Sequence, residues 1–150
     1  MPRMILTPET WAAVERRLDA LRPDARPQWG TLNAAAMVGH LAQTMRLSLG
    51  EVPVVDRSNW VLRNIVRPLA FELLPIPRGI KAPAEFDAPS VGELAAERVN
   101  LSACVGRFLA AAEATPERIG VSPLFGPMPL SYWRRIHGKH IAHHLRQFGL

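Results

Sequence analysis

Residues 133–150 read WRRIHGKHIAHHLRQFGL, and this stretch decides the fold prediction because it combines a helical apolar pattern with four histidines. Successive residues of an α-helix turn by about 100°, so His140 and His144 lie about 40° apart around the axis and one turn apart along it. Ile136 and Ile141 fall on the same side, whereas basic residues cover the opposite side. We therefore predict a final helix that directs His140 and His144 into the protein interior.

Apolar residues at spacings of three and four predict four further helices. The first covers residues 8–21, and the second runs from Thr31 or Asn33 to Leu49. The third covers residues 58–74 and is kinked at Pro68. The fourth is long, follows the capping box Ser90-Val-Gly-Glu93 and ends near Ala114. No stretch alternates apolar and polar residues clearly, so no strand is predicted. The predicted fold class is all-α, an up-and-down four-helix bundle with an additional short or kinked helix.

Composition limits the domain number and the partners. The chain has 150 residues, 48% hydrophobic and 21% charged, which predicts one globular domain over residues 1–150. The net charge of +5 comes from scattered basic residues, so no nucleic-acid partner is expected. Charged residues interrupt the apolar region 60–76, which argues against a membrane-spanning segment, and no membrane partner is expected. The lone Cys104 and the absence of a secretion signal predict a cytoplasmic protein. We expect a small-molecule substrate and leave a homodimer open.

A third histidine is expected to face the same interior. On the segment that ends at Leu49, His40 shares an apolar face with Ala36 and Met37. Burying three imidazoles without partners costs free energy, whereas a divalent cation satisfies one nitrogen on each. His40, His140 and His144 therefore form the predicted metal site, with one coordination position open. The competing interpretation is a histidine-rich helix end exposed to solvent, and the sequence also leaves open whether His137 or His143 replaces one of the three.

Two segments resemble motifs of the DinB and YfiT-like metalloenzyme superfamily. The segment HIAHHLRQFG, residues 140–149, resembles its last-helix motif, and WGTLNAAAMVGHLAQTMRLSLGE, residues 29–51, resembles its second-helix motif. The segment PLFGPMPLSYWRRIHGKH, residues 123–140, is similar to an uncharacterised bacterial branch. The resemblance implies that the same three histidines bind a divalent metal, zinc or nickel, within a four-helix bundle. It also implies a class of enzymes that includes S-transferases using glutathione, bacillithiol or mycothiol and metal-dependent isomerases.

Other residues are candidates for substrate binding. Thr44 and Ser48 follow His40 on the same helix face, and Arg78 and Lys81 lie in a proline-rich connection that could close over an anionic group. We expect a metal-dependent enzyme, with a low-molecular-weight thiol as the cofactor of an S-transferase acting on small electrophiles. A metal-dependent hydrolase and a non-catalytic metal-binding or structural protein are the alternatives. The sequence identifies neither the metal nor the substrate.

Overall fold

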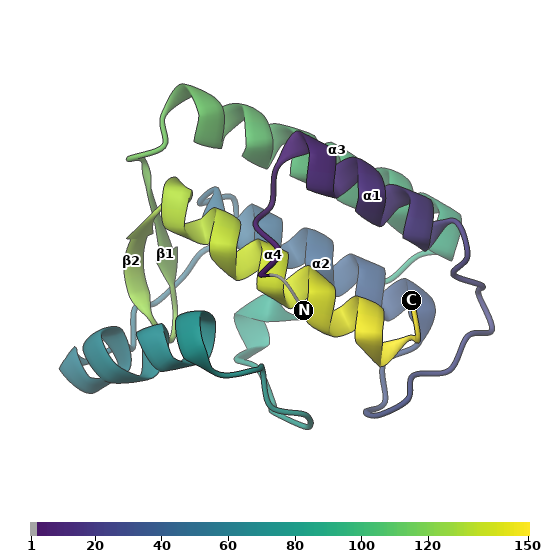
Figure 1. Ribbon diagram of the computed structural model, residues 1–150, viewed down its shortest axis with the longest axis horizontal. Helices are drawn as coiled ribbons and strands as arrows, with labels where there is room; N and C mark the ends of the chain where they lie inside the picture. The colour runs from purple at the N-terminus through teal and green to yellow at the C-terminus, as the bar shows by residue number, and fades with distance from the viewer. Residues whose placement is uncertain (1–2) are drawn as a thin grey trace.

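The computed structural model describes residues 3–150, most of which are helical. The four long helices are α1 (Pro8–Leu18), α2 (Ala34–Ser48), α3 (Leu94–Ala114) and α4 (Leu130–Gln147). The shorter elements are the π-helical turns η1 (Leu62–Val66) and η2 (Leu69–Leu73), the 3-10 turn η3 (Ala84–Phe86) and the strands β1 (Ile119–Ser122) and β2 (Gly126–Pro129). The long helices lie side by side, with the strands near one end and η1 and η2 below (Figure 1). The mostly helical class is confirmed, but the strands were not predicted.

Local sequence signals explain where α1 and α2 begin and where α2 ends. Thr7 and Asn33 accept hydrogen bonds from backbone amides in the first turns of α1 and α2, as expected for N-caps. Gly50 follows Leu49, the C-cap of α2, and has φ +75°, the left-handed conformation that suits glycine at a helix end. The predicted capping box before α3 is wrong, because the helix begins at Leu94 and Glu93 makes no side-chain cap.

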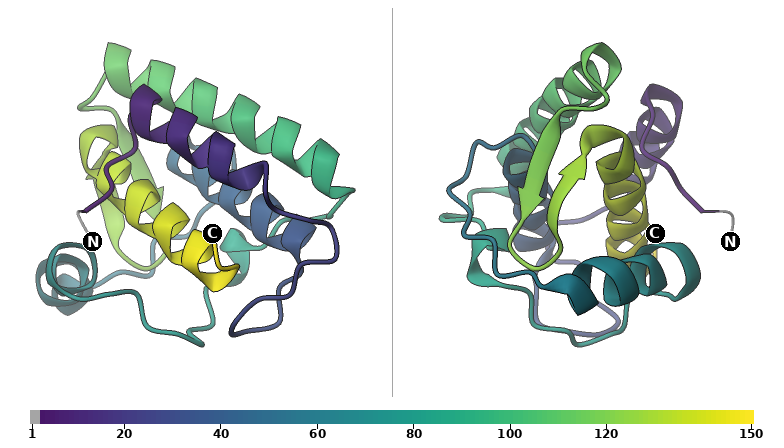
Figure 2. Two further views of the ribbon diagram at one scale, coloured as in Figure 1. Left: turned by 45° about the vertical axis from the view of Figure 1, so that its right-hand side comes forward. Right: turned by 90° about the vertical axis from the view of Figure 1, so that its left-hand side faces the viewer.

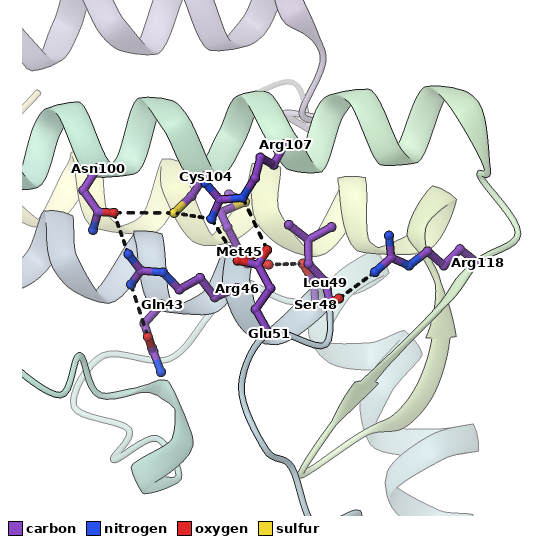
Figure 3. A network of polar contacts seen from close by, with 10 residues as sticks. All are labelled: Gln43, Met45, Arg46, Ser48, Leu49, Glu51, Asn100, Cys104, Arg107 and Arg118. Atoms are coloured by element: carbon purple, nitrogen blue, oxygen red, sulfur yellow. Dashed lines mark hydrogen bonds and ion pairs between the residues drawn. The ribbon is translucent and has the colours of Figure 1, made fainter.

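The directions of the helices correct the predicted topology. Arg46 on α2 donates to the Asn100 side chain on α3 at 2.5 Å, and Glu51, just after α2, pairs with Arg107 further along α3 at 2.8 Å (Figure 3). The second contact lies closer to the C-terminus than the first on both sides, so α2 and α3 run parallel. The up-and-down order is therefore wrong, because parallel neighbours require the long crossover formed by residues 49–93.

The two strands form an antiparallel hairpin between α3 and α4. Ile119 pairs with Pro129 and Ser122 pairs with Gly126. The hairpin packs against the C-terminal end of α2, and the Trp133 indole on α4 donates to the Gly120 carbonyl at 3.0 Å. Glycine and proline occupy several of these strand positions, so the apolar alternation that predicts a strand is missing.

The core lies between the long helices. Its largest fully buried side chains come from every long helix except α1, from β2 and from the segment before α1: Leu6, Met37, Leu41, Met45, Leu47, Leu101, Phe108, Met128, Leu130, Trp133, Ile141 and Leu145. α1 adds Trp11, Val14 and Leu18, which follow the predicted spacing of three and four. Within residues 3–150, no helix is both long and apolar enough to cross a membrane.

Gly138 is expected to be required for packing of the N-terminal segment on α4. A Cβ atom there would overlap the backbone carbonyl of Met4, whereas a Cβ atom at Gly106 on α3 would meet nothing within 4 Å. Gly138→Ala should lower the free energy of unfolding by about 1–3 kcal/mol through overpacking. Gly106→Ala should raise it by about 0.5–1 kcal/mol, because alanine favours a helix interior. Urea denaturation measures both, and a stabilised Gly138→Ala variant would contradict the packing argument.

Candidate metal centre

The three predicted histidines meet in the structure. His40 is on α2, and His140 and His144 are one turn apart on α4. The Nε2 atom of His140 lies 2.9 Å from Nε2 of His40 and 3.0 Å from Nε2 of His144. One nitrogen from each ring lies within 4.8 Å of the other two, so the three form a group that could hold a metal ion.

The outer nitrogens of two rings are held by hydrogen bonds. Nδ1 of His40 lies 2.8 Å from the backbone carbonyl oxygen of Phe86, and Nδ1 of His144 lies 2.7 Å from Oε1 of Gln147. The Gln147 amide is oriented in turn, because its nitrogen donates to the Trp29 carbonyl at 2.8 Å. Carbonyl oxygens only accept hydrogen bonds, so both Nδ1 atoms carry the proton. Nε2 of His40 and Nε2 of His144 therefore present lone pairs to His140.

This arrangement leaves one Nε2 lone pair without a hydrogen-bond donor. A neutral His140 carries one N–H, so it can donate to His40 or to His144 but not to both. Burial, followed by the neighbouring imidazoles, lowers the pKa of His140 well below its ordinary value. Burial also lowers the pKa of His40, and it lowers the pKa of His144 to about 3. Neutral rings whose lone pairs converge on one point are a ligand set for a divalent cation.

The cluster borders a cavity of about 660 Å³. Most of the cavity wall is apolar and comes from α2 and from the loops on either side of it, through Leu32, Ala36, Ile76, Pro77, Ile80, Ala82, Ala88 and Val91. The polar groups at the wall include Lys81, Asp87 and His143 in addition to the three clustered histidines. A cavity with apolar walls and a few polar groups at one side is typical of a small-molecule site.

The predicted substrate-binding residues differ in their position relative to the cavity. Thr44 and Ser48 are buried and do not line this cavity, and their hydroxyls donate to backbone carbonyls of α2. Arg78 lies in the proline-rich connection, and its guanidinium is 4.2 Å from the centre of the Trp29 ring, while Trp29 itself lines the cavity. Of the residues proposed to contact a ligand, only Lys81 lines the cavity. Arg78 adjoins it through its contact with Trp29, and Thr44 and Ser48 do not line it.

The other two histidines of α4 occupy separate environments. Nε2 of His137 lies 2.8 Å from the Ser48 hydroxyl, and its Nδ1 is buried without a hydrogen-bond partner. His143 packs edge-on against Trp29 and lines the cavity. Neither belongs to the three-nitrogen group. The sequence could not show the Phe86 and Trp29 carbonyls, because any residue type supplies a backbone carbonyl.

Comparison with known proteins gives a family but no function. Residues 2–149 match DUF1569, which is described as a protein of unknown function. The chain belongs to the DUF1569 family. No curated protein and no solved structure matches this DUF1569 chain.

Acid should destabilise the metal-free protein through its buried histidines. Burial lowers the pKa of His137 to about 3, whereas an unfolded histidine titrates near about 6.5. The unfolded chain therefore binds more protons between these values, and stability falls as pH falls. Between pH 7 and 5, His137 alone should account for about 2 kcal/mol of this loss.

Denaturation in chelator-containing buffer at the two pH values tests this expectation. The His137→Gln variant should lose about 2 kcal/mol less than the unchanged protein over the same interval. An equal loss in both proteins would show that His137 is not held neutral by burial.

Proposed function

We propose that His40, His140 and His144 bind one divalent metal ion through their Nε2 atoms, and that the protein is a metal-dependent enzyme acting on a small molecule. The observation that carries the proposal is the pair of Nε2 lone pairs, on His40 and His144, that face a third nitrogen able to satisfy only one of them. The Phe86 carbonyl fixes the His40 ring, and the Gln147 side chain, oriented by the Trp29 carbonyl, fixes the His144 ring. A cation at the point of convergence would satisfy all three nitrogens. The adjoining cavity gives a small molecule access to that point.

The resemblance of the two helix motifs supports a finer assignment. We place the chain in the DinB and YfiT-like superfamily, as one domain over residues 1–150 built on a four-helix bundle, with zinc or nickel as the metal. The histidines that carry the resemblance are the three that meet in the structure. A cytoplasmic location is part of the proposal and is supported by the buried free thiol of Cys104.

The proposed reaction is thiol-dependent transfer to a small electrophile. When bound, a divalent ion with an open position favours the anionic form of a thiol or of water at neutral pH. In this proposal Lys81, which lines the cavity, pairs with a carboxylate of a low-molecular-weight thiol, and Arg78 approaches the same group from its position on Trp29. The apolar wall accommodates the electrophile. Hydrolysis is the alternative if water takes the place of the thiol.

Metal analysis tests the site directly. Protein purified without chelator should contain about one divalent ion per chain, because one set of three nitrogens is present. His140→Ala removes the nitrogen that contacts both others and should abolish binding. Elemental analysis and calorimetric titration with zinc and nickel measure both results. Purified protein without bound metal that also fails to bind added zinc or nickel would reject the proposal.

Two further variants distinguish loss of a metal ligand from a general disruption of α4. His143→Ala changes a neighbouring histidine whose ring is outside the cluster, so it should retain the metal. Gln147→Ala removes the hydrogen bond that orients His144 and should weaken binding by about 10–100-fold. Equal loss of metal in His143→Ala and His144→Ala would contradict the assignment of ligands.

Activity assays distinguish the reactions. The metal-loaded protein should consume electrophiles in the presence of glutathione, bacillithiol or mycothiol, and a metal-free sample should not. Lys81→Ala should raise the KM for the thiol while the metal content stays unchanged, because Lys81 lies at the cavity wall outside the metal cluster. Turnover of ester or amide substrates without any thiol would favour the hydrolase instead.

A further inference from the structure

The helical segment 60–73 carries its apolar residues on the outside. Trp60 is 68% exposed and Leu73 is 70% exposed, and the large side chains between them on this face are also exposed: Val61, Ile65 and Leu69. This segment lies below the hairpin and α4 (Figure 2), and η2 contacts α4. Surface helices ordinarily place polar residues outward, so an outer stripe of this kind marks a binding surface.

Polar interactions on the inner side explain why the segment has this orientation. Arg63 pairs with the Asp56 carboxylate at 2.7 Å and donates to the Ser58 hydroxyl at 2.6 Å. Arg67 lies with its guanidinium 5.4 Å from the centre of the Tyr132 ring. The two arginines are thus turned toward the protein, and the apolar stripe is turned away from it.

A group of basic residues adjoins one end of the stripe. Arg3, Arg135, Lys139 and Arg146 line a cavity of about 450 Å³ together with Leu73 and Leu74. Glu72 is the one acidic residue of that lining, and among the residues described none of the four basic side chains forms an ion pair. The three arginines therefore have no ionic partner among the described residues, whereas the Lys139 ammonium donates to the backbone carbonyls of Ala70 and Leu74.

The charge indicates what covers this surface. A second copy packed on it around a two-fold axis would bring two sets of four cations toward each other. An anionic lipid surface supplies the opposite charge for the basic residues and an apolar layer for the stripe. We propose that the apolar–basic surface, formed by the 60–73 stripe with Arg3, Arg135, Lys139 and Arg146, docks on an anionic membrane. This proposal does not depend on the metal site, and it departs from the expectation, based on the lack of a membrane-spanning segment, that the protein has no membrane partner.

Vesicle binding tests the proposal on the full-length protein. The protein should sediment with vesicles of equimolar phosphatidylglycerol and phosphatidylcholine, bind pure phosphatidylcholine more weakly, and lose affinity as salt increases. Tryptophan emission should shift to shorter wavelength on binding, because Trp60 enters the apolar layer. The chain has four tryptophans, so Trp60→Phe should abolish most of this shift while sedimentation persists.

Matched variants identify the surface responsible. Arg135→Gln with Arg146→Gln should lower the partition coefficient by about 30-fold, at about 1 kcal/mol for each charge. Arg16→Gln with Arg26→Gln removes the same charge elsewhere and should have a much smaller effect. Leu73→Ser should weaken binding several-fold, whereas Val99→Ser, at a 73% exposed valine of α3, should not. All these side chains except Arg146 are exposed, so folding should be preserved.

Three results would overturn the proposal. The first is no sedimentation with the anionic vesicles at low salt. The second is an equal loss of binding in the two double arginine variants, which would mean that net charge alone explains the attraction. The third is a dimer in solution that Leu73→Ser converts to a monomer, which would make this surface an interface between two copies of the chain.

Discussion

The donation of two imidazole protons to fixed oxygens is the constraint on which the site depends. The Phe86 carbonyl takes the Nδ1 proton of His40, and the Trp29 carbonyl orients Gln147, which takes the Nδ1 proton of His144. Both carbonyls belong to the connections that flank α2, so these connections must close before the two lone pairs can converge. The loops are therefore structural parts of the proposed metal site, in addition to forming its cavity.

The three histidines were predictable because helical geometry is local. Spacing along α4 places His140 and His144 on one face, and the apolar neighbours of His40 place it on the buried face of α2. The parallel course of α2 and α3 was not predictable in this way. It depends on the path of residues 49–93, and amphipathic patterns contain no information about the direction of a neighbouring helix. The hairpin was missed because glycine and proline replace its alternating pattern.

Thr44 and Ser48 show a second limit of sequence periodicity. Both follow His40 at helical spacing, and the angle around the axis was correct in placing them toward the interior. The angle around the helix axis does not show, however, whether a side chain reaches the cavity or lies within the packed core. The cavity borders α2 near His40 and Ala36, whereas the next turns of the helix lie inside the packed core. There the Ser48 hydroxyl bonds to His137 and to the backbone, so a polar residue on the correct face is satisfied by the protein itself.

The same limit of sequence periodicity applies to the orientation of the apolar face of the 60–73 segment. The four-residue spacing of Val61, Ile65, Leu69 and Leu73 establishes a stripe, but it does not decide whether the stripe faces the core or the surroundings. Asp56 and Tyr132 decide it, because they hold Arg63 and Arg67 on the inner side. On α4, the histidine cluster borders the larger cavity and the basic residues border the smaller one, so a single helix separates the two. A small molecule could thus reach the histidines while the basic side is docked.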